Sequence, residues 1–174
     1  NQPVNYDSDL KIYEKADVIG TEHYSGGKTI ADFSNLEPRA GISYQLNDDQ
    51  SIKASYNRMA QYLHLVSNTG SPTPLDVWAP SGKYIKPQIL DQVALGYFRN
   101  FKDDAYSLEV ETFYKKTKNR VDYIDGADLI ANKAIEQVLL NGKARSYGLE
   151  VLLRKNEGKL TGWVSYTLSR AEQK

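Results

Sequence analysis

The sequence has no cysteine, so disulfides, cysteine-based metal sites and a thiol nucleophile are all excluded. It has no excess charge either: 22 basic side chains balance 22 acidic ones, which gives no long-range attraction for nucleic acid. Only two histidines are present, His23 and His64, and the HExxH, GxSxG and P-loop motifs are missing. We therefore predict that the protein is not an enzyme and uses neither a metal nor a cofactor.

A long hydrophobic run is also missing. The mean hydropathy is −0.58, and no stretch approaches the ~18 apolar residues that a membrane helix needs. This excludes a helical membrane protein, but a membrane β-barrel turns every second residue toward water and is therefore hydrophilic on average. The chain opens without the basic start and apolar run of a signal peptide. Either the mature protein begins here or the chain is a piece of something longer.

The sequence is rich in tyrosine, with 13 residues, and in alternating apolar and polar residues. Three polar turns, 46–50, 101–105 and 155–159, each lie between two alternating runs, and their Asn, Asp and Gly residues indicate hairpins. The predicted strands are 38–46, 51–59, 91–101, 105–119, 143–155 and 160–170. These lengths exceed the ~5–6 residues of a typical soluble strand and suit the ~9–11 residues of a membrane strand.

The connections between the hairpins are long. Residues 60–90, which contain four prolines, join the first hairpin to the second, and residues 120–142 join the second to the third. Within the latter, 125–140 is compatible with a short helix or a lid. Residues 1–37 precede the first hairpin and are predicted to be an extracellular loop or edge segment. Short turns at one end of the strands and long loops at the other are typical of outer-membrane barrels, whose turns are periplasmic and whose loops are extracellular.

A soluble antiparallel sandwich or a lipocalin-like barrel alternates in the same way, with its apolar face turned inward. Pattern alone does not separate the two classes. Strand length and loop asymmetry favour an all-β, antiparallel transmembrane barrel segment of about six long strands. A soluble or surface β-barrel that binds a ligand, and an outer-membrane barrel that does not transport, remain the alternative functions.

Four segments carry a resemblance to a known family. Residues 37–68, EPRAGISYQLNDDQSIKASYNRMAQYLHLVSN, resemble the middle barrel strands of TonB-dependent outer-membrane receptors, especially those of Bacteroidetes-type bacteria. KPQILDQVALGYFRNF (86–101), GKARSYGLEVLLRK (142–155) and GWVSYTLSRAE (162–172) resemble later strands of such receptors. Each motif is a weak amphipathic strand, whereas their order and spacing together are more specific, and the likeness covers residues 37–172.

The resemblance implies a bacterial outer-membrane receptor that takes up a nutrient (an iron chelate, cobalamin, a glycan or a peptide) with energy delivered by TonB. Such receptors have a 22-stranded barrel around an N-terminal plug that engages TonB. Neither the plug nor a TonB-engaging segment is recognisable here, and the chain ends in LSRAEQK instead of a closing strand with a terminal aromatic residue. We therefore expect an internal segment, with barrel strands over 38–172, outer-membrane lipid and TonB as partners, and no transport by the chain alone.

The connection 60–90 is the best place for a ligand contact, because it contains residue types that hold sugars, peptides or chelates by stacking and hydrogen bonding. The candidate ligand-binding residues are His64, Asp76, Trp78 and Tyr84. The alternative is that these side chains only fold the loop onto itself.

On the strands, Glu109 and Glu111 are expected to line a hydrated lumen and not to act as an acid–base pair. Tyr106 and Tyr166 belong to the predicted lipid face, where tyrosines form interfacial girdles. Trp163 is predicted on the lumen side, close to the third turn.

Overall fold

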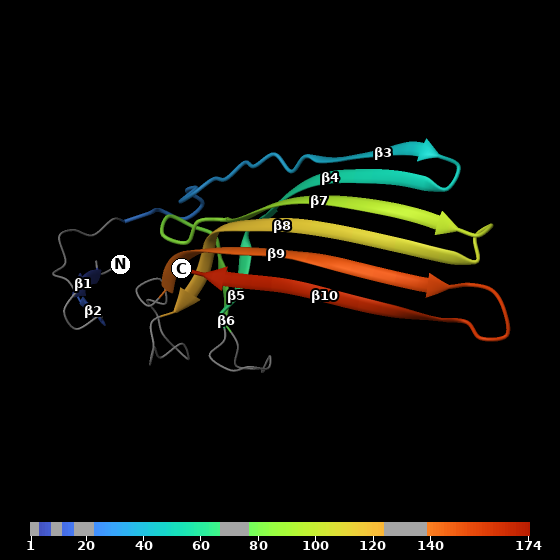
Figure 1. Cartoon of the computed structure of the whole chain (residues 1–174). Coiled ribbons are helices and arrows are strands. Elements are labelled where there is room, and N and C mark those ends of the chain that lie inside the picture. The colour runs from blue at the N-terminus through green and yellow to red at the C-terminus, as the bar shows by residue number, and fades with distance from the viewer. Residues whose placement is uncertain (1–3, 8–11, 16–22, 67–76, 124–138) are drawn as a thin grey trace. The chain divides into compact units, whose positions relative to one another are not determined.

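The computed structural model describes residues 4–7, 12–15, 23–66, 77–123 and 139–174 (Figure 1). Within these ranges every regular element is a β-strand, as the alternation predicts. They contain no helix that is long and apolar enough to cross a membrane. The chain divides into two compact units, which are described separately: 36–59 with 89–117 and 143–174, and 1–35 with 60–88 and 118–142.

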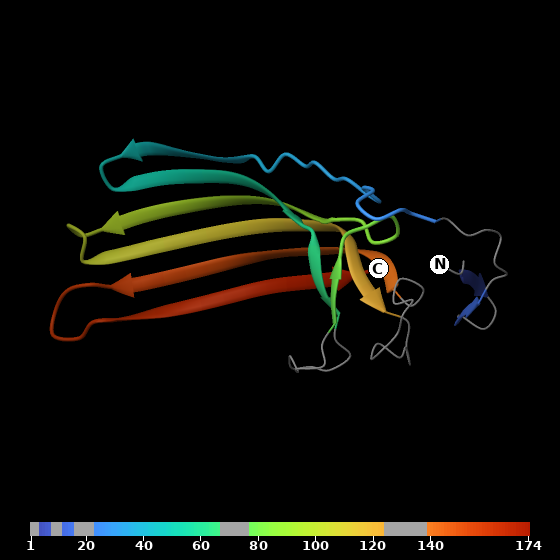
Figure 2. The ribbon, with the colours of Figure 1, turned by 180° about the vertical axis from the view of Figure 1, so that it is seen from behind.

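The main sheet has six strands in the order β10-β9-β8-β7-β4-β3, which both views show (Figures 1 and 2). The strands are β3 Arg39–Asn47, β4 Gln50–Gln61, β7 Gln88–Phe101, β8 Tyr106–Tyr123, β9 Leu139–Lys155 and β10 Gly162–Gln173. The three predicted hairpins, β3–β4, β7–β8 and β9–β10, are confirmed, and their short turns lie together at one end of the sheet. We call this the turn end, and the opposite end the loop end.

Several strands are longer than predicted, and residues 60–61 and 88–90 of the predicted connection are strand. β8 continues to Tyr123 and β9 begins at Leu139, so residues 120–123 and 139–142 are strand and not connection. Most of the possible helix or lid at 125–140 lies outside the described residues, and its last two residues, Leu139 and Leu140, are strand. The predicted loops also contain short hairpins: β5 Leu63–Val66 with β6 Val77–Pro80, and β1 Val4–Asp7 with β2 Ile12–Lys15.

The turn between β7 and β8 has an unusual backbone. Lys102, Asp103 and Asp104 have φ angles of 52°, 52° and 69°, in the left-handed region that favours glycine and that Asp tolerates better than most residues. Asparagines hold this turn in place. The Nδ2 of Asn100 donates to Oδ1 of Asp104 (2.6 Å), and the Nδ2 of Asn156, from the next hairpin, donates to the Asp104 carbonyl (3.0 Å). Neighbouring hairpins are thus tied together at the turn end.

Cross-strand register sorts the side chains onto two faces, because directly paired residues point the same way. Between β9 and β10, Leu153 pairs with Val164, Val151 with Tyr166, and Leu149 with Leu168, so these six side chains form one apolar row. The corresponding pairs between β3 and β4 are Ala40–Tyr56, Ile42–Ala54 and Tyr44–Ile52. The apolar face is exposed: Ile42 is 70% accessible, Val164 71% and Leu168 60%.

The opposite face is polar, but two phenylalanine rings pack close to glycines. An added Cβ at Gly96 would meet the Phe98 ring at 2.7 Å, and one at Gly148 would meet the Phe113 ring and the Leu168 carbonyl oxygen at 2.9 Å. The Nζ of Lys53 lies 4.4 Å from the Phe98 ring centroid. Glycine is therefore required at Gly148, where the added Cβ would meet a backbone oxygen, whereas at Gly96 a shift of the Phe98 ring could make room.

Candidate functional site

The predicted ligand-binding residues fall around the β5–β6 hairpin. Its register pairs Leu63 with Pro80, His64 with Ala79, and Leu65 with Trp78. Since side chains alternate between the faces of a ribbon, His64 and Trp78 point to opposite sides of it. The two predicted ligand-binding residues therefore lie on different surfaces of one hairpin.

His64 belongs to the buried side of this hairpin. It is 4% exposed, and Ala79 and Ile85 are each 3% exposed. Its Nε2 lies 3.2 Å from the Ser81 hydroxyl oxygen, and the Ser81 backbone N–H donates to the Tyr62 carbonyl (2.7 Å). Burial lowers the pKa of His64, so the ring is neutral at physiological pH. This environment supports the alternative reading for His64, in which it packs the loop.

The exposed side of the hairpin is apolar throughout. Trp78 is 59% exposed, Leu65 40% and Leu63 47%, and Pro80, paired with Leu63, is exposed as well. We call these four residues the hairpin platform. A flat apolar surface built around an indole ring can stack against a sugar ring, a porphyrinoid or an aromatic chelator. Trp78 is one of the predicted ligand-binding residues, and its neighbours on the platform are not; the signal that points to them is the alternation of Leu63 and Leu65 with His64.

Tyr84 lies in the loop that follows the hairpin. Tyr84 is 45% exposed, and its backbone carbonyl oxygen accepts a hydrogen bond from Asn141 Nδ2 (3.4 Å). Further along, Asn119 Nδ2 donates to the Pro87 carbonyl (2.9 Å), so the loop is anchored to segments distant in sequence. Asp76, the fourth candidate, lies outside the described residues. Among the described residues, no group of three His, Asp or Glu side chains could hold a metal ion.

The six-stranded sheet is the second candidate functional feature. Along the strands, its apolar face is bounded by charged residues at the turn end and at the loop end. On β9, the side chains between Arg145 and Lys155 on this face are Tyr147, Leu149, Val151 and Leu153. Ten residues at about 3.3 Å each span about 33 Å, or about 25 Å across a membrane at a strand tilt near 40°. This matches the ~25 Å apolar band of outer-membrane barrels.

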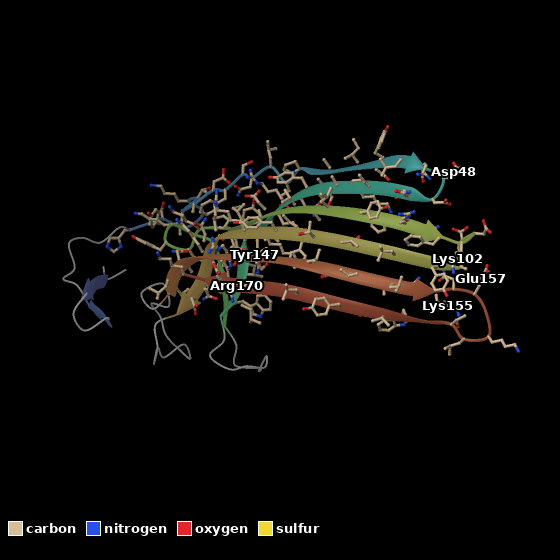
Figure 3. The ribbon with its side chains drawn as sticks, viewed as in Figure 1. Asp48, Lys102, Tyr147, Lys155, Glu157 and Arg170 are labelled. Carbon is tan, nitrogen blue, oxygen red and sulfur yellow. The ribbon has the colours of Figure 1, made fainter. Side chains whose placement is uncertain are left out.

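Charged and aromatic residues mark both edges of this band. At the turn end, the Nζ atoms of Lys102 and Lys155 lie 5.5 Å and 5.9 Å from the Tyr106 ring centroid. At the loop end, Tyr114 stacks on Tyr147 at 6.5 Å (Tyr147 is labelled in Figure 3). Aromatic girdles at two levels are the pattern expected of a lipid-facing wall.

Comparison with known proteins agrees with this geometry. The family model described as "TonB dependent receptor-like, beta-barrel" matches residues 8–174. Searches of curated proteins and of solved structures find no match.

Proposed function

Because the chain belongs to the β-barrel family of TonB-dependent receptors, we propose that its six-stranded sheet is part of an outer-membrane barrel that takes up a specific nutrient. The family is one of outer-membrane receptors and transporters that work with TonB, and not of enzymes. The nutrient classes that we propose are those expected from the sequence: iron chelates, cobalamin, glycans or peptides. A Bacteroidetes-type source is part of the same proposal.

The observation that carries this proposal is the exposed apolar face bounded by charged residues about 33 Å apart along the strand, or about 25 Å in membrane depth at a tilt near 40°. Leu95 on β7 and Leu168 on β10 are 52% and 60% exposed, although large aliphatic side chains in a soluble domain are normally buried. In our account this face meets lipid, and the opposite face, with Lys53 and Glu111, lines a water-filled lumen. The two open edges, β3 and β10, then pair with further strands of the barrel.

The turn end is periplasmic in this account and the β5–β6 hairpin is extracellular. Cysteine labelling of intact cells tests the arrangement in a receptor that carries this segment and has no other cysteine. A membrane-impermeant maleimide is expected to react with Ser81→Cys in intact cells, and with Asp103→Cys only after permeabilisation. Labelling of Asp103→Cys but not Ser81→Cys in intact cells would contradict the proposal.

We assign ligand contact to the hairpin platform around Trp78, with Tyr84 nearby in sequence as a second candidate. Cells that express the receptor are offered a ferric chelate, cobalamin, an oligosaccharide and a peptide, and uptake of each is measured. Trp78→Ala is expected to lower uptake of the transported compound at least tenfold. Trp163→Ala is the matched control. It removes the other tryptophan of the chain, which lies on β10 of the six-stranded sheet, and it is expected to leave uptake unchanged. Equal uptake by both variants would remove the platform from the binding site.

A further inference from the structure

We infer that the outward face of β8, β9 and β10 at the loop end is a binding site for phosphate groups of glycolipids in the outer leaflet. This inference rests on the proposed function, because it requires that the apolar face meets lipid. Three levels of side chains, described in turn below, carry it (Tyr147 and Arg170 are labelled in Figure 3). All of them belong to the six-stranded sheet unit.

The lowest level is aromatic. Tyr114 on β8 stacks on Tyr147 of β9, and Tyr147 pairs directly with Arg170 of β10. Below this level the paired residues are Leu149 and Leu168, which belong to the apolar band. Tyrosines at such a boundary sit at the level of lipid headgroups. The residues above them therefore face the headgroup region.

The middle level is ionic. Glu172 of β10 pairs with Arg145 of β9 and forms ion pairs with both Arg145 and Arg170, the latter at 2.8 Å. Lys116 follows Tyr114 by two residues on β8, so it lies on the same face at the level of Arg145. The nearby carboxylate of Asp91 on β7 is held by Arg58 in a bidentate pair (2.7 and 3.2 Å). One carboxylate, Glu172, thus serves two arginines, and Lys116 has no ion pair with a described residue.

The highest level consists of two lysines that face each other. Lys143 and Lys174 exchange both backbone hydrogen bonds, at 2.7 Å and 2.9 Å, which makes them a directly opposed cross-strand pair. Their Cβ atoms are therefore about 5 Å apart on one face, and like charges in this position are destabilising. Neither ammonium group forms an ion pair within the described part of the chain, and both residues are exposed. An anion shared by the two would remove the repulsion.

Charge and position together identify that anion. Within the described residues of the sheet unit, β8, β9 and β10 carry five cations at this end of the face, namely Lys116, Lys143, Arg145, Arg170 and Lys174, and one carboxylate, Glu172, while the Arg58–Asp91 pair adds no net charge. Arginine and lysine side chains make strong charge-assisted hydrogen bonds to phosphate. The surface directly above a tyrosine girdle lies at the level of the lipid headgroups. We therefore assign the site to a phosphorylated lipid headgroup and not to a free anion.

The test uses the intact receptor that carries this segment, purified in a non-ionic detergent, and fluorescent bisphosphorylated lipid A as the probe. Binding is followed by anisotropy in 150 mM salt. The double variant Lys143→Gln/Lys174→Gln is expected to bind the probe about tenfold more weakly, through loss of two charge-assisted contacts. The matched control Lys102→Gln/Lys155→Gln, which removes two cations from the turn end of the same sheet, is expected to bind like the parent.

Three results would overturn the inference: unchanged binding by the Lys143/Lys174 variant, equal binding of dephosphorylated lipid A by the parent, or displacement of the probe by millimolar inorganic phosphate. Misfolding is not the expected cause of weaker binding. In phosphatidylcholine vesicles the double variant should be at least as stable as the parent, because a like-charge pair has been removed. A nitroxide at Val110 tests the proposed function separately. If Val110 is exposed to lipid while the Lys143/Lys174 variant binds lipid A like the parent, only this inference is refuted and the proposed function stands.

Discussion

Replacing Val110 by arginine puts a charge at the middle of the proposed lipid face. Val110 lies on β8 four residues from Tyr106 and four from Tyr114, and both tyrosines share its face. Four residues span about 13 Å along the strand, or about 10 Å of membrane depth at a tilt near 40°. Val110 is therefore close to the bilayer midplane, where an arginine costs about 2–4 kcal/mol.

The free energy of unfolding is measured by guanidinium titration of the intact receptor in phospholipid vesicles. Glu111→Arg is the matched control, because the neighbouring residue points to the lumen, and its cost should stay below about 1 kcal/mol. A buried valine in a soluble core would also suffer from arginine, so a second variant is needed. Val110→Phe is expected to be neutral in lipid but costs about 1–3 kcal/mol in a packed core. A large loss for Val110→Phe would refute the lipid-facing assignment.

Three further predictions concern the polar face, the β7–β8 turn and the β5–β6 hairpin. Gly148→Ala should lower the free energy of unfolding by about 1–3 kcal/mol, because the added Cβ would lie 2.9 Å from the Leu168 carbonyl oxygen; an unchanged denaturation midpoint would contradict this packing. Asp103→Val should cost about 1 kcal/mol and Asp103→Gly should not, because φ is 52° there, and equal midpoints for the two would argue against a left-handed turn. The pKa of His64 is lowered by folding, so the unfolded hairpin binds the proton more readily; its stability is complete above about pH 6.5 and falls below it. The protection factors of the β5 and β6 amides, which correct for the slower intrinsic exchange at low pH, should therefore fall on acidification in the parent but not in His64→Leu.

The sequence predicts the strands well where one face is apolar and the other polar. The predicted ends agree with β3 within one residue and with β10 within three, because Ile42 and Tyr44, or Tyr166 and Leu168, alternate with serine and threonine. The predicted end of β8, at 119, falls four residues short of Tyr123, because residues 115–120 are polar on both faces and alternation gives no signal there. The pattern also does not specify whether an exposed apolar face meets lipid or protein; strand length and end charges carry that distinction.

The four candidate ligand-binding residues stay a prediction, and the structure shows how their environments differ. Trp78 and Tyr84 are exposed as a ligand contact requires, whereas His64 is buried, which a single histidine between two leucines does not reveal. The β5–β6 hairpin was hidden by the prolines of the connection. Pro80 is tolerated because it is the last residue of a strand in a two-stranded ribbon, where an N–H donor is not needed on the outer edge. The opposed lysines Lys143 and Lys174 could not be found without the register.

The lipid exposure of β8 is the central claim, and a nitroxide at Val110 measures it most directly. The intact receptor is spin-labelled at Val110, and separately at Glu109 on the opposite face, and reconstituted into bilayers. The account predicts that relaxation at Val110 is enhanced strongly by oxygen, which concentrates in lipid, and hardly by a polar nickel chelate, with the reverse order at Glu109. Shielding of Val110 from both reagents would show that the apolar face is packed against protein and would contradict the account.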